Sequence, residues 1–185
     1  ENPKPGSTHT YDYTAWVPQA ASGHGRLMRF GMFGTWPSGF SAQNVDGFDP
    51  VANEWDLPGT WPDSPGTYGT ARNRETGEVY VSGGAYKIDP DGGFEAATGV
   101  KTVRFPNAYD SKRHALFGLM FGDGQGYDLK LGVVARLNDL RVHTTTDITF
   151  NSSAALTQFI HDQPAYAGMD YDEANDRYLF YAAGD

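Results

Sequence analysis

The 185-residue sequence contains no cysteine, and this absence excludes several kinds of site. A chain without thiols has no disulfide framework, no thiolate ligand for zinc and no cysteine nucleophile. The absence does not identify the compartment, because disulfide-free proteins occur in reducing and oxidising surroundings alike.

Long apolar runs and positive charge are also scarce. No stretch approaches the roughly 20 apolar residues that span a bilayer, and residues 1–6 lack the charged and apolar regions of a signal peptide. The 14 basic residues are outnumbered by 23 acidic residues, which gives a formal net charge of −9. Because this charge repels nucleic acid and anionic lipid, we expect no nucleic-acid partner and no membrane insertion.

Glycine, proline and aromatic residues are abundant by contrast. The chain has 23 glycines and 11 prolines, and aromatic residues make up 14% of it. This composition is typical of many short strands joined by tight turns, and it suits helical packing poorly. We therefore expect an all-β fold, formed by one domain or a large part of one.

The order of the residues indicates internal repeats. Four tyrosines stand just after a small or polar residue and shortly before an apolar run, at spacings of 57, 41 and 57 residues: Tyr11, Tyr68, Tyr109 and Tyr166. Repeats of this length, with variable loops that make the spacing uneven, are typical of the blades of a β-propeller.

The segments that follow Tyr68 and Tyr166 resemble each other most closely. At a constant offset of 98 residues, Tyr80 aligns with Tyr178 and Gly77 aligns with Asn175. Glycine and asparagine adopt a positive φ most readily, as a hairpin closed by a type I turn and a bulge requires. The alignment therefore predicts a positive φ at both Gly77 and Asn175.

Two further patterns locate strands and turns. The segments 26–34 and 114–122 are nearly continuous apolar runs that end in glycine, and we expect their strands to be buried on both faces. The segments 47–55 and 86–94 each carry Asp-Pro after an apolar residue. Since Asp caps a turn and Pro presets its φ, each predicts the hairpin between the third and fourth strands of a blade.

Three of these features together resemble the kelch repeat, which forms a four-stranded antiparallel β-propeller blade. They are an apolar strand ending in Gly83-Gly84, the turn Phe48-Asp49-Pro50, and Asn53-Glu54-Trp55. The resemblance covers roughly residues 8–185, although a single copy has the double glycine and a single copy has the tryptophan. It implies an N-terminal extension and about three and a half blades, at residues 1–7, 8–66, 67–107, 108–163 and, for the partial blade, 164–185. Kelch-like propellers usually have six or seven blades, so the resemblance also implies self-association or remaining blades that close the propeller.

A repeated tetrapeptide, Gly-Thr-Trp-Pro, provides the candidate ligand contacts. It occurs at residues 34–37 and 59–62, in segments rich in glycine and serine. A tryptophan on such a loop can stack on a sugar ring, so we predict ligand contacts at Trp36, Phe40 and Trp61. The alternative is that the indoles cover the ends of the blades.

The segment 123–128 is the candidate metal site. Asp123, Gln125 and Asp128 could direct oxygen atoms toward a calcium ion around a bend that glycine permits. The segment lacks the terminal glutamate of an EF-hand, and a solvated turn is the alternative. The five histidines do not have the spacing of a metal site. Calcium is thus the one candidate cofactor.

These observations favour a non-catalytic binding or assembly module that presents variable loops on a β-propeller scaffold to a protein or glycan partner. An extracellular or virion structural protein fits the glycine and aromatic content. Two alternatives stay open: a carbohydrate-active hydrolase or lyase whose site lies partly outside this segment, and an intracellular kelch-type adaptor. The galactose-oxidase-like copper enzymes also resemble kelch propellers, but their cofactor needs a cysteine that this chain lacks.

Overall fold

The computed structural model describes residues 14–30, 45–57, 59–62, 70–81, 86–96, 107–120, 134–142, 144–149 and 167–182. Within these ranges the backbone forms short strands and one four-residue helix, which confirms the expected all-β class. In chain order the elements are β1 (Thr14–Val17), α1 (Ala20–Gly23), β2 (Arg26–Arg29), β3 (Asp46–Asp49), β4 (Glu54–Trp55), β5 (Thr70–Arg72), β6 (Val79–Val81), β7 (Tyr86–Ile88), β8 (Phe94–Ala96), β9 (Asn107–Asp110), β10 (Ala115–Met120), β11 (Val134–Asp139), β12 (Thr144–Thr149), β13 (Ala167–Asp172) and β14 (Arg177–Ala182).

The strands form four antiparallel sheets in which each strand pairs with the next along the chain. We name them sheet 1 (β1 to β4), sheet 2 (β5 to β8), sheet 3 (β9 to β12) and sheet 4 (β13 and β14). Sheets 1, 2 and 4 lie within the segments 8–66, 67–107 and 164–185, whereas sheet 3 begins at Asn107, one residue before the segment 108–163. Among the described residues no sheet closes on itself.

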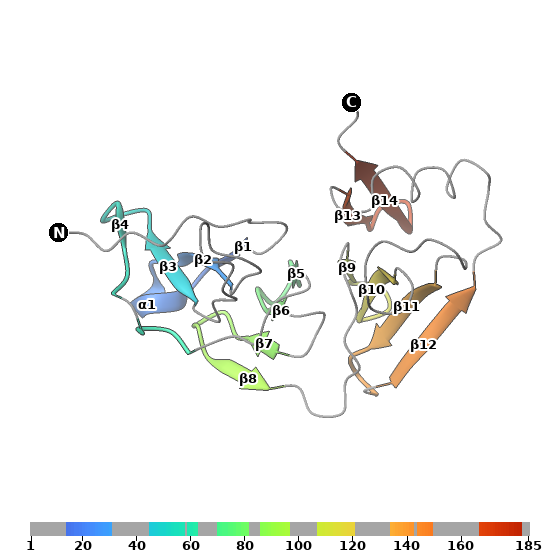
Figure 1. Ribbon diagram of the computed structural model, residues 1–185, viewed down its shortest axis with the longest axis horizontal. Helices are drawn as coiled ribbons and strands as arrows, with labels where there is room; N and C mark the ends of the chain where they lie inside the picture. The colour runs from blue at the N-terminus through green and yellow to red at the C-terminus, as the bar shows by residue number, and fades with distance from the viewer. Residues whose placement is uncertain are drawn as a thin grey trace, which may run out of the picture.

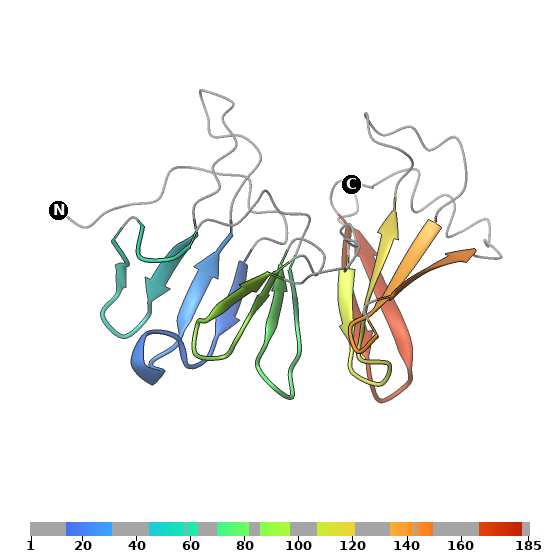
Figure 2. The same cartoon turned by 90° about the horizontal axis from the view of Figure 1, so that it is seen from below.

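The first strands of successive sheets lie side by side. Strand β1 contacts β5, β5 contacts β9, and β9 contacts β13. In Figure 1 these strands gather toward the centre, and the later strands of each sheet spread outward from them. Figure 2 shows that the turns joining first to second and third to fourth strands all lie at one end of the molecule. This arrangement is compatible with that of a propeller.

Apolar side chains from facing sheets form the core. Between sheets 1 and 2, Met28 and Val17 pack with Val79, Val81 and Ile88, and all five are fully buried. Successive residues of a strand point to opposite faces. Tyr80, between Val79 and Val81, therefore packs on the other side of sheet 2, against sheet 3. Each such side chain contributes about 1.5–3 kcal/mol when it is fully buried.

Aromatic rings join the other sheets. Tyr80 of sheet 2 stacks on Tyr109 of sheet 3, with ring centroids 5.7 Å apart. Phe117 of sheet 3 stacks on Tyr178 of sheet 4 at 4.0 Å. Ring stacking of this kind adds about 0.5–1.5 kcal/mol to the burial of the rings.

The two long apolar segments differ in how they are buried. In β10, Ala115, Leu116 and Phe117 are at most 3% exposed, which confirms burial on both faces. In β2, Leu27 is 41% exposed while Met28 is buried, so the same prediction is wrong there. The physical reason is that sheet 1 packs against another described sheet through one face only.

The hairpin turns share one design that the alignment located only in part. In four turns the side chain of an Asp or Asn accepts a backbone N–H two or three residues later, and the fourth residue after it has a positive φ. The pairs are Asp49 with Asn53, Asn73 with Gly77, Asp110 with His114, and Asp172 with Asp176. Aspartate and asparagine suit the first position because their short side chains reach back to the backbone.

Two turn predictions can now be compared with the backbone. The positive φ of Gly77, +81°, is confirmed, but in sheet 4 the positive φ belongs to Asp176 and not to Asn175. The β5–β6 and β13–β14 hairpins begin at Asn73 and Asp172. The equivalent residues of these hairpins are therefore one residue further apart than the 98-residue offset. Both Asp-Pro predictions are confirmed, since Asp49-Pro50 joins β3 to β4 and Asp89-Pro90 joins β7 to β8.

We predict that Gly77→Ala lowers the free energy of unfolding by about 1–2 kcal/mol, because an L-residue is strained at this φ. A Cβ atom would also come within 3.1 Å of the Pro18 ring. Gly93→Ala is the matched control in a turn of the same sheet, where φ is not positive and a Cβ atom meets only ordinary contacts. Urea denaturation measures both variants, and equal losses would contradict the role of Gly77.

Candidate functional site

Trp61 is the one aromatic candidate that the structure describes, since Trp36 and Phe40 lie outside the described residues. Its ring packs against the core between sheets 1 and 2. Its Nε1 donates to Asp56 Oδ2 at 2.8 Å. The indole N–H is therefore already used inside the protein, and a ligand contact through the exposed part of the ring stays a prediction.

An ion cluster fixes the position of Trp61. The Arg26 side chain is largely buried, and its guanidinium bridges Asp49 at 3.0 Å and Asp56 at 3.1 Å. Arg26 Nη1 also donates to the carbonyl oxygen of Gly25 at 2.8 Å. This cluster holds the end of sheet 1 together.

The candidate calcium ligands Asp123, Gln125 and Asp128 lie outside the described residues. Within the described ranges, no group of three or more His, Asp or Glu side chains is placed to hold a metal ion. Calcium binding at 123–128 stays a prediction.

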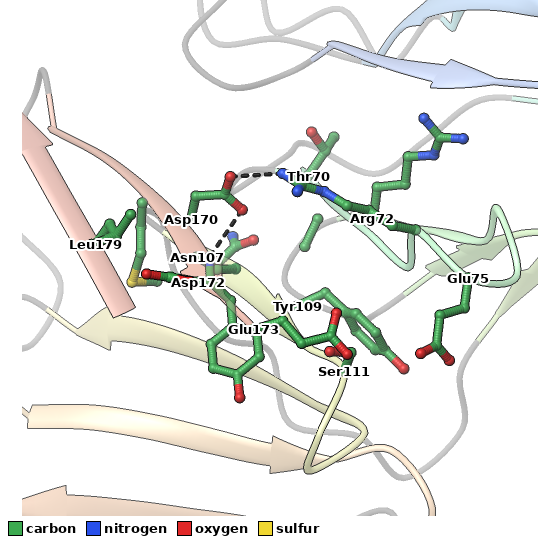
Figure 3. A pocket seen from close by; sticks show the side chains of 15 residues that line it. Thr70, Arg72, Glu75, Asn107, Tyr109, Ser111, Asp170, Asp172, Glu173 and Leu179 are labelled. Carbon is green, nitrogen blue, oxygen red and sulfur yellow. Dashed lines mark hydrogen bonds and ion pairs between the residues drawn. The ribbon is translucent and has the colours of Figure 1, made fainter. Parts of the chain in front are cut away.

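A cleft of about 400 Å³ lies where the first strands of sheets 2, 3 and 4 meet. Its lining comes from β5, β9, β13, the turns that follow them, and Leu179 of β14 (Figure 3). The lining residues are Thr70, Ala71, Arg72, Arg74, Glu75, Asn107, Ala108, Tyr109, Ser111, Met169, Asp170, Tyr171, Asp172, Glu173 and Leu179. We call this site the central cleft.

Charged side chains form two opposite walls of the central cleft. Figure 3 shows Arg72 and Glu75 on the side of sheet 2, and Asp170 and Asp172 on the side of sheet 4. Arg74 Nη2 reaches across to Asp170 Oδ2 at 2.7 Å. Both side chains of this pair are more than half exposed, so it contributes at most about 1 kcal/mol and can open for a ligand.

Strand β9 lies between these walls and contributes polar atoms held by the neighbouring sheets. The Tyr109 hydroxyl accepts a hydrogen bond from Asn73 Nδ2 at 3.0 Å and lies 2.6 Å from His114 Nδ1. Burial, with the charge of Glu75 nearby, raises the pKa of Tyr109 to about 12, so the phenol stays protonated at neutral pH. The buried Ser111 Oγ has no hydrogen-bond partner among the residues that the structure describes.

Asp110 stands between the lining residues Tyr109 and Ser111 and joins sheet 3 to sheet 4. Its side chain is fully buried. Oδ1 accepts the backbone N–H of Arg113, and Oδ2 accepts Arg113 Nη1 at 2.8 Å and the Tyr178 hydroxyl at 2.5 Å. Burial and the bond to Asp110 raise the pKa of Tyr178 far above its ordinary value. The carboxylate thus links the β9–β10 turn to the ring stack of Tyr178 on Phe117.

Asp176 continues this network at the tip of the β13–β14 turn. Its carboxylate contacts Arg113 at 2.6 Å and Lys112 at 2.9 Å, and it accepts the Tyr171 hydroxyl at 2.7 Å. These three partners hold the pKa of Asp176 well below its usual range. Burial first, and then the bond to Asp176, raises the pKa of Tyr171 to about 12.

The central cleft is not evident from the sequence alone. Its residues belong to the opening strands and turns of three different repeats, and no short motif contains them. The available signal was the run of polar residues at each first hairpin, 72–75, 107–111 and 170–173. Equivalent strands of successive repeats lie side by side, so these runs converge in space.

The sequence matches no protein-family model and no curated protein. In the part of the chain that the structure describes, no helix has the length and apolar character needed to cross a bilayer.

We predict that Asp110→Ala lowers the free energy of unfolding by about 2–4 kcal/mol, because it leaves Arg113 and the buried Tyr178 hydroxyl without their acceptor. The control is Asp139→Ala in the other hairpin of sheet 3, where Oδ1 accepts the exposed backbone N–H of Arg141. This variant should lose less than about 1 kcal/mol. Chemical denaturation compares the two, and a small loss for Asp110→Ala would refute the anchoring role.

The low pKa of Asp176 predicts a dependence of stability on acid. A carboxyl group with a depressed pKa in the folded state stabilises the protein above its unfolded pKa of about 4, and this contribution is lost as the pH falls through the folded value. Asp176→Asn keeps a residue that tolerates the positive φ but removes the charge. The difference between urea midpoints at neutral and acid pH should be smaller in this variant, and an unchanged difference would argue against the network.

Proposed function

We propose that this protein is a non-catalytic binding or assembly module built on propeller-like blades, and that the central cleft binds a polar partner. The observation that carries the proposal is the convergence of polar side chains from three successive first strands on one cleft. Ligand sites commonly form where repeated elements meet and side chains of separate segments face one space. Protein and glycan partners both fit a scaffold of this kind.

The size of the cleft favours a glycan over a folded protein surface. Small-ligand sites span about 300–1,000 Å³, and a protein partner usually covers about 800 Å² on each side. The cleft, at about 400 Å³, lies in the first range.

The chemistry of the lining supports a neutral or amino sugar. Carboxylates accept hydrogen bonds from sugar hydroxyls, and guanidinium groups donate to ring and hydroxyl oxygens. The lining holds four carboxylates against two guanidinium groups: Glu75, Asp170, Asp172 and Glu173 against Arg72 and Arg74. This excess of negative charge, together with the net charge of −9, disfavours sialylated or sulfated glycans.

The propeller interpretation rests on the repetition of the sheets. Three sheets have four strands in the same order, and their first strands are adjacent in space. The kelch resemblance supports the same architecture through the Asp-Pro hairpins and Gly83-Gly84. We also propose an extracellular or virion setting, which fits the glycine and aromatic content of the chain.

We expect a panel of immobilised neutral, amino and sulfated oligosaccharides to show binding to neutral or amino sugars. Glu173→Gln and Arg72→Ala should each weaken binding of the best oligosaccharide about tenfold, as measured by calorimetry, because each removes a charged hydrogen-bonding group from the cleft. Both residues line the cleft, and Glu173 is exposed. The control is Glu54→Gln, which changes an exposed carboxylate on sheet 1.

Two outcomes would overturn this proposal. Equal binding by Glu173→Gln, Arg72→Ala and Glu54→Gln would place the ligand elsewhere. Cleavage of the bound oligosaccharide that is abolished by changing one cleft carboxylate would show that the protein is a carbohydrate-active enzyme and not a non-catalytic module.

A further inference from the structure

Sheet 1 has one apolar face that no described sheet covers. Four large apolar side chains are aligned across its strands by the register of pairing: Trp16, Leu27, Phe48 and Trp55. Met28 lies in the core between sheets 1 and 2, and its neighbour Leu27 therefore points to the opposite face. Leu27 is 41% exposed, so this row is open to a partner.

Sheet 4 also has one face that no described sheet covers, on the side away from sheet 3. Tyr178 and Phe180 pack against Phe117 of sheet 3. The alternating residues Leu179 and Tyr181 point away from sheet 3 and are 43% and 62% exposed. Among the described residues, β14 also pairs with β13 alone.

The repeat shows what occupies the equivalent positions elsewhere. Aligning the β5–β6 and β13–β14 hairpins by their turns places Leu179 at the position of Tyr80. Tyr80 is 6% exposed because Tyr109 of the following sheet stacks on it. Likewise, Val79 is fully buried on the face of sheet 2 that meets the preceding sheet, sheet 1. Leu27 lies on the corresponding face of sheet 1. Sheet 4 thus offers the surface that a following sheet covers, and sheet 1 the surface that a preceding sheet covers.

We propose that the open face of sheet 4 packs against the open face of sheet 1 in a second copy of this chain. The contact continues the sheet-to-sheet packing that already joins sheets 1 to 4. It is heterologous, because two different surfaces meet. Leu179 of this face also lines the central cleft, whereas Tyr181 does not, so a change at Tyr181 tests the contact without altering the lining of the proposed glycan site.

The net negative charge of each chain determines how the strength of this association changes with salt concentration. Two chains with a net charge of −9 repel each other, and salt screens that repulsion. Apolar burial is the attractive contribution. The self-association should therefore become stronger as the salt concentration rises.

The test is sedimentation velocity on the 185-residue chain from micromolar to hundreds of micromolar concentration, at low and high salt. The unmodified chain should form a species of at least twice the mass of one chain. Leu27→Lys and Tyr181→Lys should each weaken association at least about tenfold, by placing a charge in the apolar contact. Lysine lowers the net negative charge, so added repulsion between chains cannot explain the loss. Val142→Lys is the control, because Val142 is 60% exposed in a turn on neither face.

A mixture of the two variants separates this contact from a symmetric one. Leu27→Lys keeps the face of sheet 4 intact, and Tyr181→Lys keeps the face of sheet 1 intact. Mixed together they should form a one-to-one complex that neither forms alone, with unchanged circular dichroism in both. A monomeric chain at all concentrations, equal association of all variants, or no complex in the mixture would each overturn the proposal.

Discussion

Burial of apolar side chains between successive sheets is the constraint on which the other features of this structure depend. A short strand has few backbone hydrogen bonds, and a two- or four-stranded sheet is stable only when a face is covered. In β6 this requirement applies to both faces, since Val79 and Val81 meet sheet 1 while Tyr80 meets sheet 3. Sheets 1 and 4 each pack against one other described sheet, and this explains why Leu27 and Tyr181 are exposed.

Polar interactions act at the turn end of the sheets, where this packing leaves room for them. Arg26 joins two turns of sheet 1 to Trp61, and Asp110 joins sheet 3 to sheet 4. The central cleft lies where the first strands converge and their polar residues face one another. Its charged walls are consequently supported by sheets whose positions are fixed by apolar packing.

The sequence predicted the parts of the fold that depend on local chemistry. Gly77 and the two Asp-Pro hairpins were located correctly because turn geometry is determined by a few adjacent residues. The prediction of a positive φ at Asn175 was wrong because the two repeats differ by one residue in register. The sequence does not reveal this shift, since the neighbouring Asp176 also tolerates a positive φ. The prediction that β2 is buried on both faces was wrong, because burial of a strand face depends on a neighbouring sheet and not on the strand's own sequence. The central cleft could not be predicted, since its residues come from three repeats.

The recurring turn has a consequence for how this protein could be altered. Each turn depends on a side-chain acceptor at its first residue and a positive φ four residues later, and the residues between them, such as Glu173, Ala174 and Asn175, are exposed. These intermediate positions carry no part of the strand register, and in the β3–β4 turn the exposed residues Val51 and Ala52 belong to neither the central cleft nor the Asp110 network. The tips of the hairpins are thus sites where foreign peptides can be grafted or randomised, and the same end of the molecule would display several of them together.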